Sequence, residues 1–242
     1  MHSNARSICW AFDFDGTLSP LEKLPHQALM TDQTRSLLKD LSLLAPVIIL
    51  SGRGLLDLKK KIGLNRSILV GNHGLEISSA WIKALKAQNE CRGWKRALMS
   101  ALQKELFLNK IFLEDKKYSL SVHFLEPLTS REKLRLRSIF SWLHPEPKMI
   151  SGKNVMNLIS KSSLNKGQAL NFLMDQHGYR KSFFVGDDVT DEDVFRIKNN
   201  SIFSVRVGYS KNSHARYFLR SQNEVDRLLS DIQNFLLKLQ AT

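Results

Sequence analysis

The sequence has few cysteines and no long hydrophobic run. Its 242 residues include two cysteines, Cys9 and Cys91, which allow one disulfide at most and have no metal-ligand spacing. We therefore expect two reduced structural thiols. The longest apolar run, residues 43–50, is interrupted by Pro46 and is too short to cross a bilayer, and the residues before Trp10 do not have the pattern of a signal peptide. These absences exclude a disulfide-stapled secreted domain and a membrane protein, and we expect a cytoplasmic protein.

Charge is the unusual feature of the composition. There are 36 Lys and Arg against 23 Asp and Glu, which gives a net charge of +13 and an isoelectric point near 9.8. Residues 80–161 hold 16 basic and 7 acidic residues, a net of +9, which leaves +4 for the remainder. This charge could steer an anionic substrate, coat a nucleic acid or be a surface bias without function. Nucleic acid is the less favoured partner, because the sequence has neither an aromatic-rich single-strand platform nor a recognition helix.

Hydrophobic periodicity predicts alternating strands and helices at both ends of the chain. Strands are expected at the apolar run that begins at Trp10 and at 47–50, 67–70, 182–185 and 201–207. Helices are expected at 31–44, 55–62, 166–174, 194–197 and 223–240. Several of these strands end in glycine or polar residues. The pattern predicts an α/β fold with a doubly wound parallel sheet, whose functional site lies beyond the carboxyl ends of the strands.

The alternation of single strands and helices stops between residues 80 and 161. Here the pattern predicts a helix at 93–107, a hairpin of strands 111–115 and 118–124, a helix at 130–143, and strands at 148–150 and 155–159. This αββαββ order indicates an antiparallel module inserted into the parallel one. We therefore expect a discontinuous core, residues 1–79 and 162–242, and an inserted domain, residues 80–161.

Two carboxylates and a glycine follow the first strand, in the sequence Asp13-Phe-Asp-Gly-Thr17. Side chains two apart in a strand share a face, so Asp13 and Asp15 should lie close together, and Gly16 permits a tight turn. Neighbouring carboxylates repel unless a cation lies between them or one is protonated, which suggests a magnesium site or an acid/base pair. A strand end with solvated acids is the alternative, but the full motif directly after an apolar strand favours chemistry.

Polar groups stand at other expected element ends, in Ser51-Gly-Arg53, Lys166-Gly167 and the acidic stretch 186–193. Each alone could be a turn or a solvated first helical turn. The acidic stretch has five acids within residues 187–193, however, and these repel one another by more than a helix dipole usually offsets. A bound cation explains them better. Together these groups suit the hydrolysis of a phosphate ester.

With these motifs the chain resembles the trehalose-6-phosphate phosphatases of the haloacid-dehalogenase superfamily. The resemblance covers nearly the whole chain through residues 13–20, 51–53, 71–76, 152–155, 165–170 and 186–192. It implies a Rossmann-like haloacid-dehalogenase core with an inserted α+β cap that is mobile and supplies sugar contacts. It also implies a Mg2+-dependent phosphatase that works through an aspartyl-phosphate intermediate.

The resemblance assigns a role to each motif. Asp13 would be the nucleophile and a metal ligand, Asp15 the acid/base and a ligand through its backbone carbonyl, and Asp187 the third metal ligand. Lys166 would offset the repulsion between carboxylate and phosphate, and Ser51 would donate a hydrogen bond to a phosphoryl oxygen. The resemblance also implies that the substrate and its phosphate are bound by further residues, namely Gly52, Arg53, His73 and Glu76 around the site and Lys153 and Asn157 in the cap. Gly152 would approach the substrate beside Lys153, and Asp188 and Asp191 would act through metal-bound waters.

Two cap positions differ from the family's usual pattern. Asn157 stands where the family usually has a Glu that binds sugar hydroxyls, and His123-Phe-Leu125 stands where it usually has His-Tyr-Arg. The expected partner is a small-molecule sugar phosphate, either trehalose 6-phosphate or another sugar or glycosyl-glycerate phosphate, bound by a monomer. A nucleic-acid-binding protein and a non-catalytic phosphosugar sensor are the remote alternatives.

Overall fold

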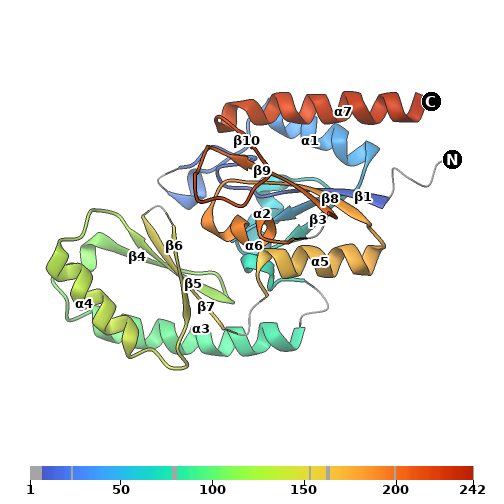
Figure 1. Ribbon diagram of the computed structural model, residues 1–242. Helices are drawn as coiled ribbons and strands as arrows, with labels where there is room; N and C mark the ends of the chain where they lie inside the picture. Colours follow the sequence, from blue (N-terminus) through green and yellow to red (C-terminus); the bar gives the residue numbers. More distant parts are fainter. Residues whose placement is uncertain are drawn as a thin grey trace. The chain divides into compact units, whose positions relative to one another are not determined.

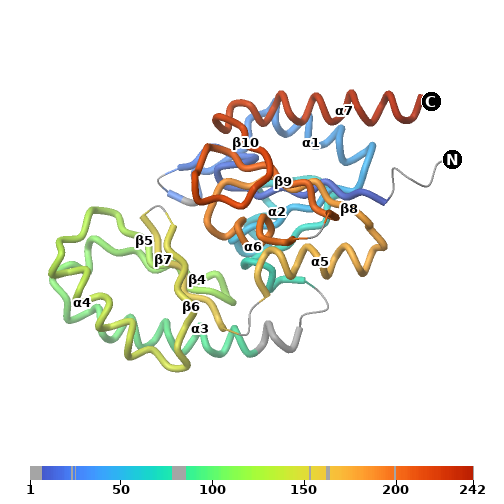
Figure 2. The backbone as a smooth tube through the Cα atoms, in the orientation of Figure 1, coloured from blue at the N-terminus to red at the C-terminus, as the bar shows by residue number. Residues whose placement is uncertain are grey.

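The computed structural model describes residues 7–22, 24–77, 81–152, 154–161, 164–198 and 200–241. The chain divides into two compact units (Figure 1): unit 1 is Met1–Gly74 with Leu164–Thr242, and unit 2 is Leu75–Ser163. Along the backbone traced in Figure 2, the helices and strands of unit 2 come between β3 (Ser67–Val70) and α5 (Lys166–His177). Unit 1 is therefore built from two separate stretches of sequence.

Unit 1 contains a parallel sheet of six strands in the order β10-β9-β8-β1-β2-β3. Besides β3, its strands are β1 (Ile8–Phe12), β2 (Val47–Leu50), β8 (Lys181–Gly186), β9 (Ile202–Val207) and β10 (Tyr217–Leu219). β1 lies between β2 and β8, and its Trp10 pairs with Val47 on one side and Phe183 on the other. The chain builds the sheet outward from β1 in opposite directions, which makes the end of β1 the switch point where ligands bind in folds of this class.

Helices cover both faces of this sheet. α1 (Asp32–Leu44), α2 (Leu55–Ile62) and α7 (Val225–Ala241) share a hydrophobic core with one face. On the other face, Phe195 of α6 (Glu192–Phe195) contacts Phe184 of β8, with ring centroids 5.7 Å apart. Figure 1 shows α5 on the opposite side of the sheet from α1 and α7. Asn165 caps the start of α5 by accepting from the backbone N–H of Gln168 at 2.8 Å, so the position of Lys166 in the first turn is well defined.

Unit 2 contains an antiparallel sheet of four strands in the order β4-β5-β7-β6. These are β4 (Ile111–Asp115), β5 (Ser119–Phe124), β6 (Lys148–Gly152) and β7 (Val155–Ile159). Residues of α3 (Trp81–Leu102) and α4 (Ser130–Ser141), such as Trp94 and Phe140, form a core with Leu120, Val122 and Leu158 on one face. Because side chains alternate along a strand, the opposite face carries the polar neighbours of those residues. Single-turn helices complete the described chain at Pro25–Gln27, Asn72–Gly74, Leu108–Lys110, Val189–Asp191 and Gln222–Glu224.

The predicted fold class, a doubly wound α/β sheet, is confirmed. The predicted helix at 93–107 was wrong in its bounds, because α3 begins at Trp81 and ends at Leu102. Gly93 suggested a boundary, but glycine inside a helix costs only about 1 kcal/mol, and a Cβ there would meet nothing within 4 Å. The sixth strand, β10, was not predicted, because it is three residues long. Within the described residues, no helix has the length and apolar content to span a membrane.

Candidate active site

The turn after β1 places Asp13 at the switch point of the sheet. The backbone N–H of Asp13 continues the pairing with β8 by donating to the Val185 carbonyl at 2.8 Å. The chain then turns within a few residues at Gly16, which has a φ of +79°, and a Cβ there would lie 2.1 Å from Oδ2 of Asp187. Glycine is needed at this position for both reasons, since any side chain would separate the loop after β1 from the loop after β8.

A buried lysine joins two of the predicted acids. Nζ of Lys166 donates to Oδ1 of Asp13 and to Oδ1 of Asp191, both at 2.8 Å, and the lysine side chain is 2% exposed. The other oxygen of Asp191, Oδ2, accepts from the backbone N–H groups of Asp187 at 2.9 Å and Asp188 at 3.0 Å. Asp191 therefore fixes the loop after β8 and the lysine at once.

The cluster carries more negative than positive charge. Ligand oxygens of Asp13, Asp187 and Asp191 lie within 4.8 Å of one another, and Lys166 contacts two of these acids, Asp13 and Asp191. Burial, followed by the charges of the neighbouring acids, raises the pKa of Asp13 to about 7 and that of Asp187 to about 9. Burial lowers the pKa of Lys166, but Asp13 and Asp191 raise it by more, so the lysine stays charged. The three carboxylates are therefore short of positive charge.

These residues fit a divalent cation. Oδ1 of Asp187 is buried and has no hydrogen-bond partner in the part of the chain that the structure describes, although a buried carboxylate oxygen normally has one. Magnesium and calcium prefer oxygen ligands, carboxylates above all. A cation held between Asp13 and Asp187, with Asp191 beside them, would supply both the missing partner and the missing charge.

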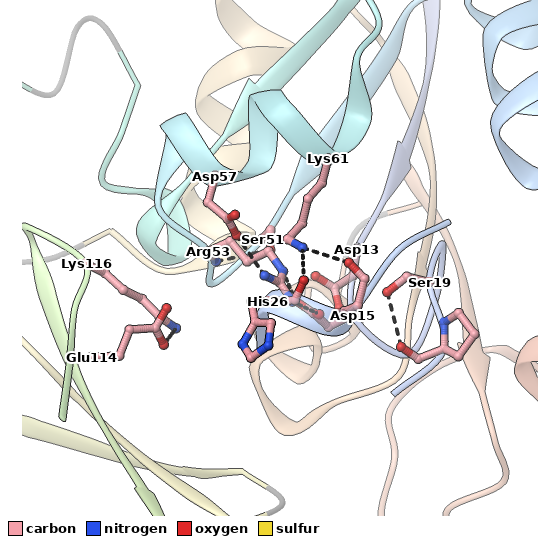
Figure 3. Close-up of polar contacts among 12 residues, drawn as sticks. Asp13, Asp15, Ser19, His26, Ser51, Arg53, Asp57, Lys61, Glu114 and Lys116 are labelled. Carbon is pink, nitrogen blue, oxygen red and sulfur yellow. Dashed lines mark hydrogen bonds and ion pairs between the residues drawn. The ribbon is translucent and has the colours of Figure 1, made fainter. Parts of the chain in front are cut away.

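The side chain of Asp15 points to an arginine (Figure 3). Arg53 donates from Nε to Oδ2 of Asp15 at 2.7 Å and from Nη2 to Oδ1 at 2.5 Å. Its Nη1 donates to Oδ2 of Asp57 at 2.7 Å, and its guanidinium carbon lies 5.2 Å from the centroid of the Phe14 ring. Burial lowers the pKa of Arg53, but the two carboxylates more than reverse this and raise it. Arg53 thus connects the loop after β1 to α2.

The loops after β2 and β3 are joined to each other. The backbone N–H of His73 donates to the Ser51 carbonyl at 3.0 Å, and that of Asn72 donates to the Arg53 carbonyl at 2.7 Å. Ser51 is 1% exposed and its Oγ accepts from the backbone N–H of Arg53 at 3.1 Å. A Cβ at Gly52 would lie 2.5 Å from the His73 ring, so only glycine allows this contact. The structure thus brings Ser51, Gly52, Arg53 and His73 to the same end of the sheet as Asp13.

Sequence reasoning missed two polar residues in this region. Asp57 is one turn after Arg53, and this i,i+4 spacing was the available signal. Lys61 is 7% exposed and donates to the backbone carbonyl of His26 at 3.0 Å (Figure 3). It also donates to the backbone carbonyl of Ala28 at 2.8 Å. No local pattern indicates that contact, because its acceptors are backbone atoms more than thirty residues earlier.

The acidic stretch 186–193 does not act as one cation site. Glu192 is buried and accepts from Nη1 of Arg206 at 3.3 Å and from the backbone N–H of His214 at 3.0 Å. Burial raises the pKa of Glu192, but these donors reverse the effect and lower it. The repulsion within the stretch is therefore relieved in two places, by Lys166 at Asp191 and by Arg206 at Glu192.

The remaining predicted residues belong to unit 2. Glu76 and Asn157 lie there, and Lys153 lies outside the described residues. Asn157 is 9% exposed, and its Oδ1 accepts from Oγ of Ser121 at 2.6 Å. Glu114 pairs with Ser121 across the sheet, and Ser121 pairs with Asn157, so the three form a row on the face opposite α3 and α4. Oε2 of Glu114 also contacts Nε2 of His123 at 2.8 Å and Nζ of Lys116 at 3.6 Å.

Comparison with known proteins gives one consistent result. The sequence profile of the trehalose-phosphatase family matches residues 11–223. Trehalose-phosphate phosphatase B of Arabidopsis thaliana is 27% identical over 248 residues, which cover 94% of this chain and 66% of that protein. The chain thus spans about two thirds of that relative's length.

Solved structures agree with the profile. The trehalose-6-phosphate phosphatase of Aspergillus fumigatus is 25% identical, with a TM-score of 0.62 over 95% of this chain and 93% of that one. A trehalose-6-phosphate phosphatase related protein has a TM-score of 0.76 at 19% identity, over 97% of this chain and 100% of that one, which supports the fold.

Proposed function

Because the chain belongs to the trehalose-phosphatase family, whose members are phosphatases of the haloacid-dehalogenase type, we propose that it hydrolyses trehalose 6-phosphate to trehalose and phosphate. The single observation that carries the proposal is the buried contact of Lys166 with Asp13, beside Asp187 and Asp191, at the switch point of the sheet. Such a site can hold a phosphate ester next to a carboxylate nucleophile.

The first step transfers the phosphoryl group to Asp13. A carboxylate oxygen of Asp13 forms a bond to phosphorus while the bond from phosphorus to the sugar oxygen breaks, and Asp15 gives its proton to the departing alkoxide. In the second step Asp15 takes a proton from a water molecule, whose oxygen attacks phosphorus, and the bond to Asp13 breaks to release phosphate. Asp13 and Asp15 are then ready for another cycle.

The surroundings of Asp13 suit this attack. Lys166 lies 2.8 Å from the nucleophilic carboxylate and lowers its repulsion for a phosphate dianion, and Ser51 can donate to a phosphoryl oxygen. Asp13 and Asp187, with Asp191 beside them, would hold Mg2+, which when bound adds further positive charge at the phosphate. Phosphoryl transfer depends mostly on such positioning and electrostatics.

We propose that unit 2 is the cap that binds the sugar. The face of its sheet opposite α3 and α4 carries a carboxylate, a hydroxyl and an amide in one row, Glu114, Ser121 and Asn157, with His123 beside them. Sugar hydroxyls both donate and accept hydrogen bonds, and this row offers both kinds of partner. Because Oδ1 of Asn157 is occupied by Ser121, its amide N–H groups are the atoms left for a sugar.

The experiment is phosphate release from a panel of sugar phosphates in Mg2+, with Asp13→Asn as the inactive control. We expect trehalose 6-phosphate to have the highest kcat/KM, and Asp13→Asn to be inactive with every ester. If glucose 6-phosphate, sucrose 6-phosphate or glucosyl-3-phosphoglycerate is preferred, the reaction stands and the substrate is wrong. If wild-type protein and Asp13→Asn release phosphate equally, the assignment of the nucleophile is wrong.

A further inference from the structure

We propose that Arg53 and Asp57 are positioning residues, which hold the carboxylate of Asp15 in the direction it needs as acid and base. The inference rests on the proposed function, because it concerns the proton that Asp15 gives to the leaving group. It differs from the expectation that Arg53 binds the phosphate of the substrate.

The contacts of Arg53 support positioning. Two adjacent N–H groups, on Nε and Nη2, meet the two oxygens of Asp15 at 2.7 and 2.5 Å, which is the bidentate geometry of a planar guanidinium with a carboxylate. Nη1 is engaged by Asp57 at 2.7 Å. Three of the five N–H groups of the guanidinium therefore donate to these two carboxylates.

The guanidinium is fixed on several sides. Its side chain is 6% exposed, and it lies over the Phe14 ring. The backbone of Arg53 is held as well, since its N–H donates to Ser51 Oγ and its carbonyl accepts from Asn72. The side chain of Asp15, in contrast, is 35% exposed and directly precedes the turn at Gly16. Arg53 is held more firmly than Asp15, and it therefore determines the direction of the Asp15 side chain.

Asp57 links this arrangement to a helix. It lies in the first turn of α2, four residues after Arg53, and its side chain is 48% exposed. An exposed ion pair of this kind adds little to the stability of the fold. We infer that the ion pair of Asp57 with Arg53 instead restrains the rotamer of the Arg53 side chain. Asp57→Asn should therefore affect the reaction more than the fold.

Two esters with different leaving groups test the role. An alkoxide leaving from trehalose 6-phosphate needs a proton, whereas p-nitrophenolate leaving from p-nitrophenyl phosphate does not. Because kcat/KM covers only the steps up to release of the leaving group, it does not include the later attack of water on the phosphorus bound to Asp13. The inhibition constant of orthophosphate is measured in parallel as a direct probe of phosphate binding.

Arg53→Lys keeps the positive charge but cannot make the bidentate contact with Asp15. We expect this variant to lower kcat/KM for trehalose 6-phosphate by about tenfold or more. This is part of the roughly 100- to 10,000-fold that a general acid contributes. The loss for p-nitrophenyl phosphate should be less than about threefold, with the inhibition constant of orthophosphate unchanged. Asp57→Asn should shift the ratio of the two kcat/KM values in the same direction by about three- to tenfold, and Asp40→Asn, an exposed acid on α1, should not.

Equal losses of Arg53→Lys on both esters, with weaker inhibition by orthophosphate, would show that Arg53 binds phosphate and would overturn the proposal. Should Arg53→Lys fail to fold, Asp57→Asn decides the matter: a ratio of kcat/KM values equal to that of Asp40→Asn contradicts positioning. Wild-type protein that hydrolyses neither ester would overturn the proposed function instead, and this inference with it.

Discussion

Replacing the proposed nucleophile by its neutral isostere should make the metal-free protein more stable. Asp13 is 4% exposed and lies among other acids, so burial and like charges raise its pKa from 3.8 to about 7. An acid whose pKa is raised by folding binds more protons in the folded state than in the unfolded state. Its ionisation therefore lowers the free energy of unfolding as the pH rises from about 4 to about 7. Asp13→Asn cannot ionise, so it escapes this loss.

The size of the effect follows from the shift. The pKa of Asp13 rises by about 3 units on folding, and each unit corresponds to about 1.36 kcal/mol. The free energy of unfolding of Asp13→Asn should therefore exceed that of wild type by about 4 kcal/mol at most at pH 8, and by less than half of that at pH 5. For a protein of this size 1 kcal/mol moves Tm by about 2–4 °C, so Asp13→Asn should melt about 8–16 °C above wild type at pH 8.

Thermal unfolding in EDTA, followed by far-UV circular dichroism at pH 5 and pH 8, measures the difference directly. Asp40→Asn on α1 is the matched control, because that acid is exposed, and it should melt with wild type at both pH values. Mg2+ should then raise the Tm of wild type more than that of Asp13→Asn, since the variant has lost a ligand. The reasoning is refuted if Asp13→Asn is no more stable than wild type at pH 8, or has the same advantage at both pH values.

Three further predictions concern other buried groups. Lys166→Met should abolish phosphate release and lower the free energy of unfolding at pH 8 by about 3–5 kcal/mol, because it leaves buried carboxylates without their cation; unchanged urea unfolding would contradict this. Chelation of the divalent metal should stop phosphate release, and Asp187→Ala should raise the half-saturating Mg2+ concentration by about tenfold or more. An Mg2+ titration of Asp187→Ala that matches wild type would show that Asp187 is not a metal ligand. Burial raises the pKa of Cys91 to about 12 and also that of Cys9, so a disulfide reagent should label neither thiol at pH 8 until urea is added; rapid labelling of the native protein would show that a thiol is accessible.

Local sequence patterns were enough to predict the order of the main helices and strands of unit 1, apart from the short strand β10. An apolar run followed by glycine or acid marks a strand end, and this signal located Asp13, Ser51 and the acidic stretch 186–193. Because parallel strands place their carboxyl ends on one edge, predicting the strands also predicted which residues would meet. The position of Asp13 beside Lys166, 153 residues away, followed from this topology and from the resemblance.

Partner choice among charged side chains could not be predicted in the same way. Arg53 could have faced a phosphate, yet it meets Asp15 and Asp57, and Asp191 binds Lys166 directly. Glu192 belongs to the same motif but meets Arg206. A motif gives the residue types at a site, whereas the direction of each side chain depends on distances of a few ångströms that only the packed chain defines.

The split of unit 1 along the chain has a consequence for its synthesis. β1 pairs with β2 on one side and with β8 on the other, where Ile8 lies opposite Lys181, so its sheet cannot be completed until the ribosome has made β8, β9 and β10. Unit 2 is continuous, Leu75–Ser163, and all its strands pair with one another. Contacts that are close in sequence form faster than distant ones, and domains fold as units during synthesis. Unit 2, which is made second, should therefore be native first, and the cluster of Asp13, Lys166 and Asp191 should assemble last, when β8 pairs with β1.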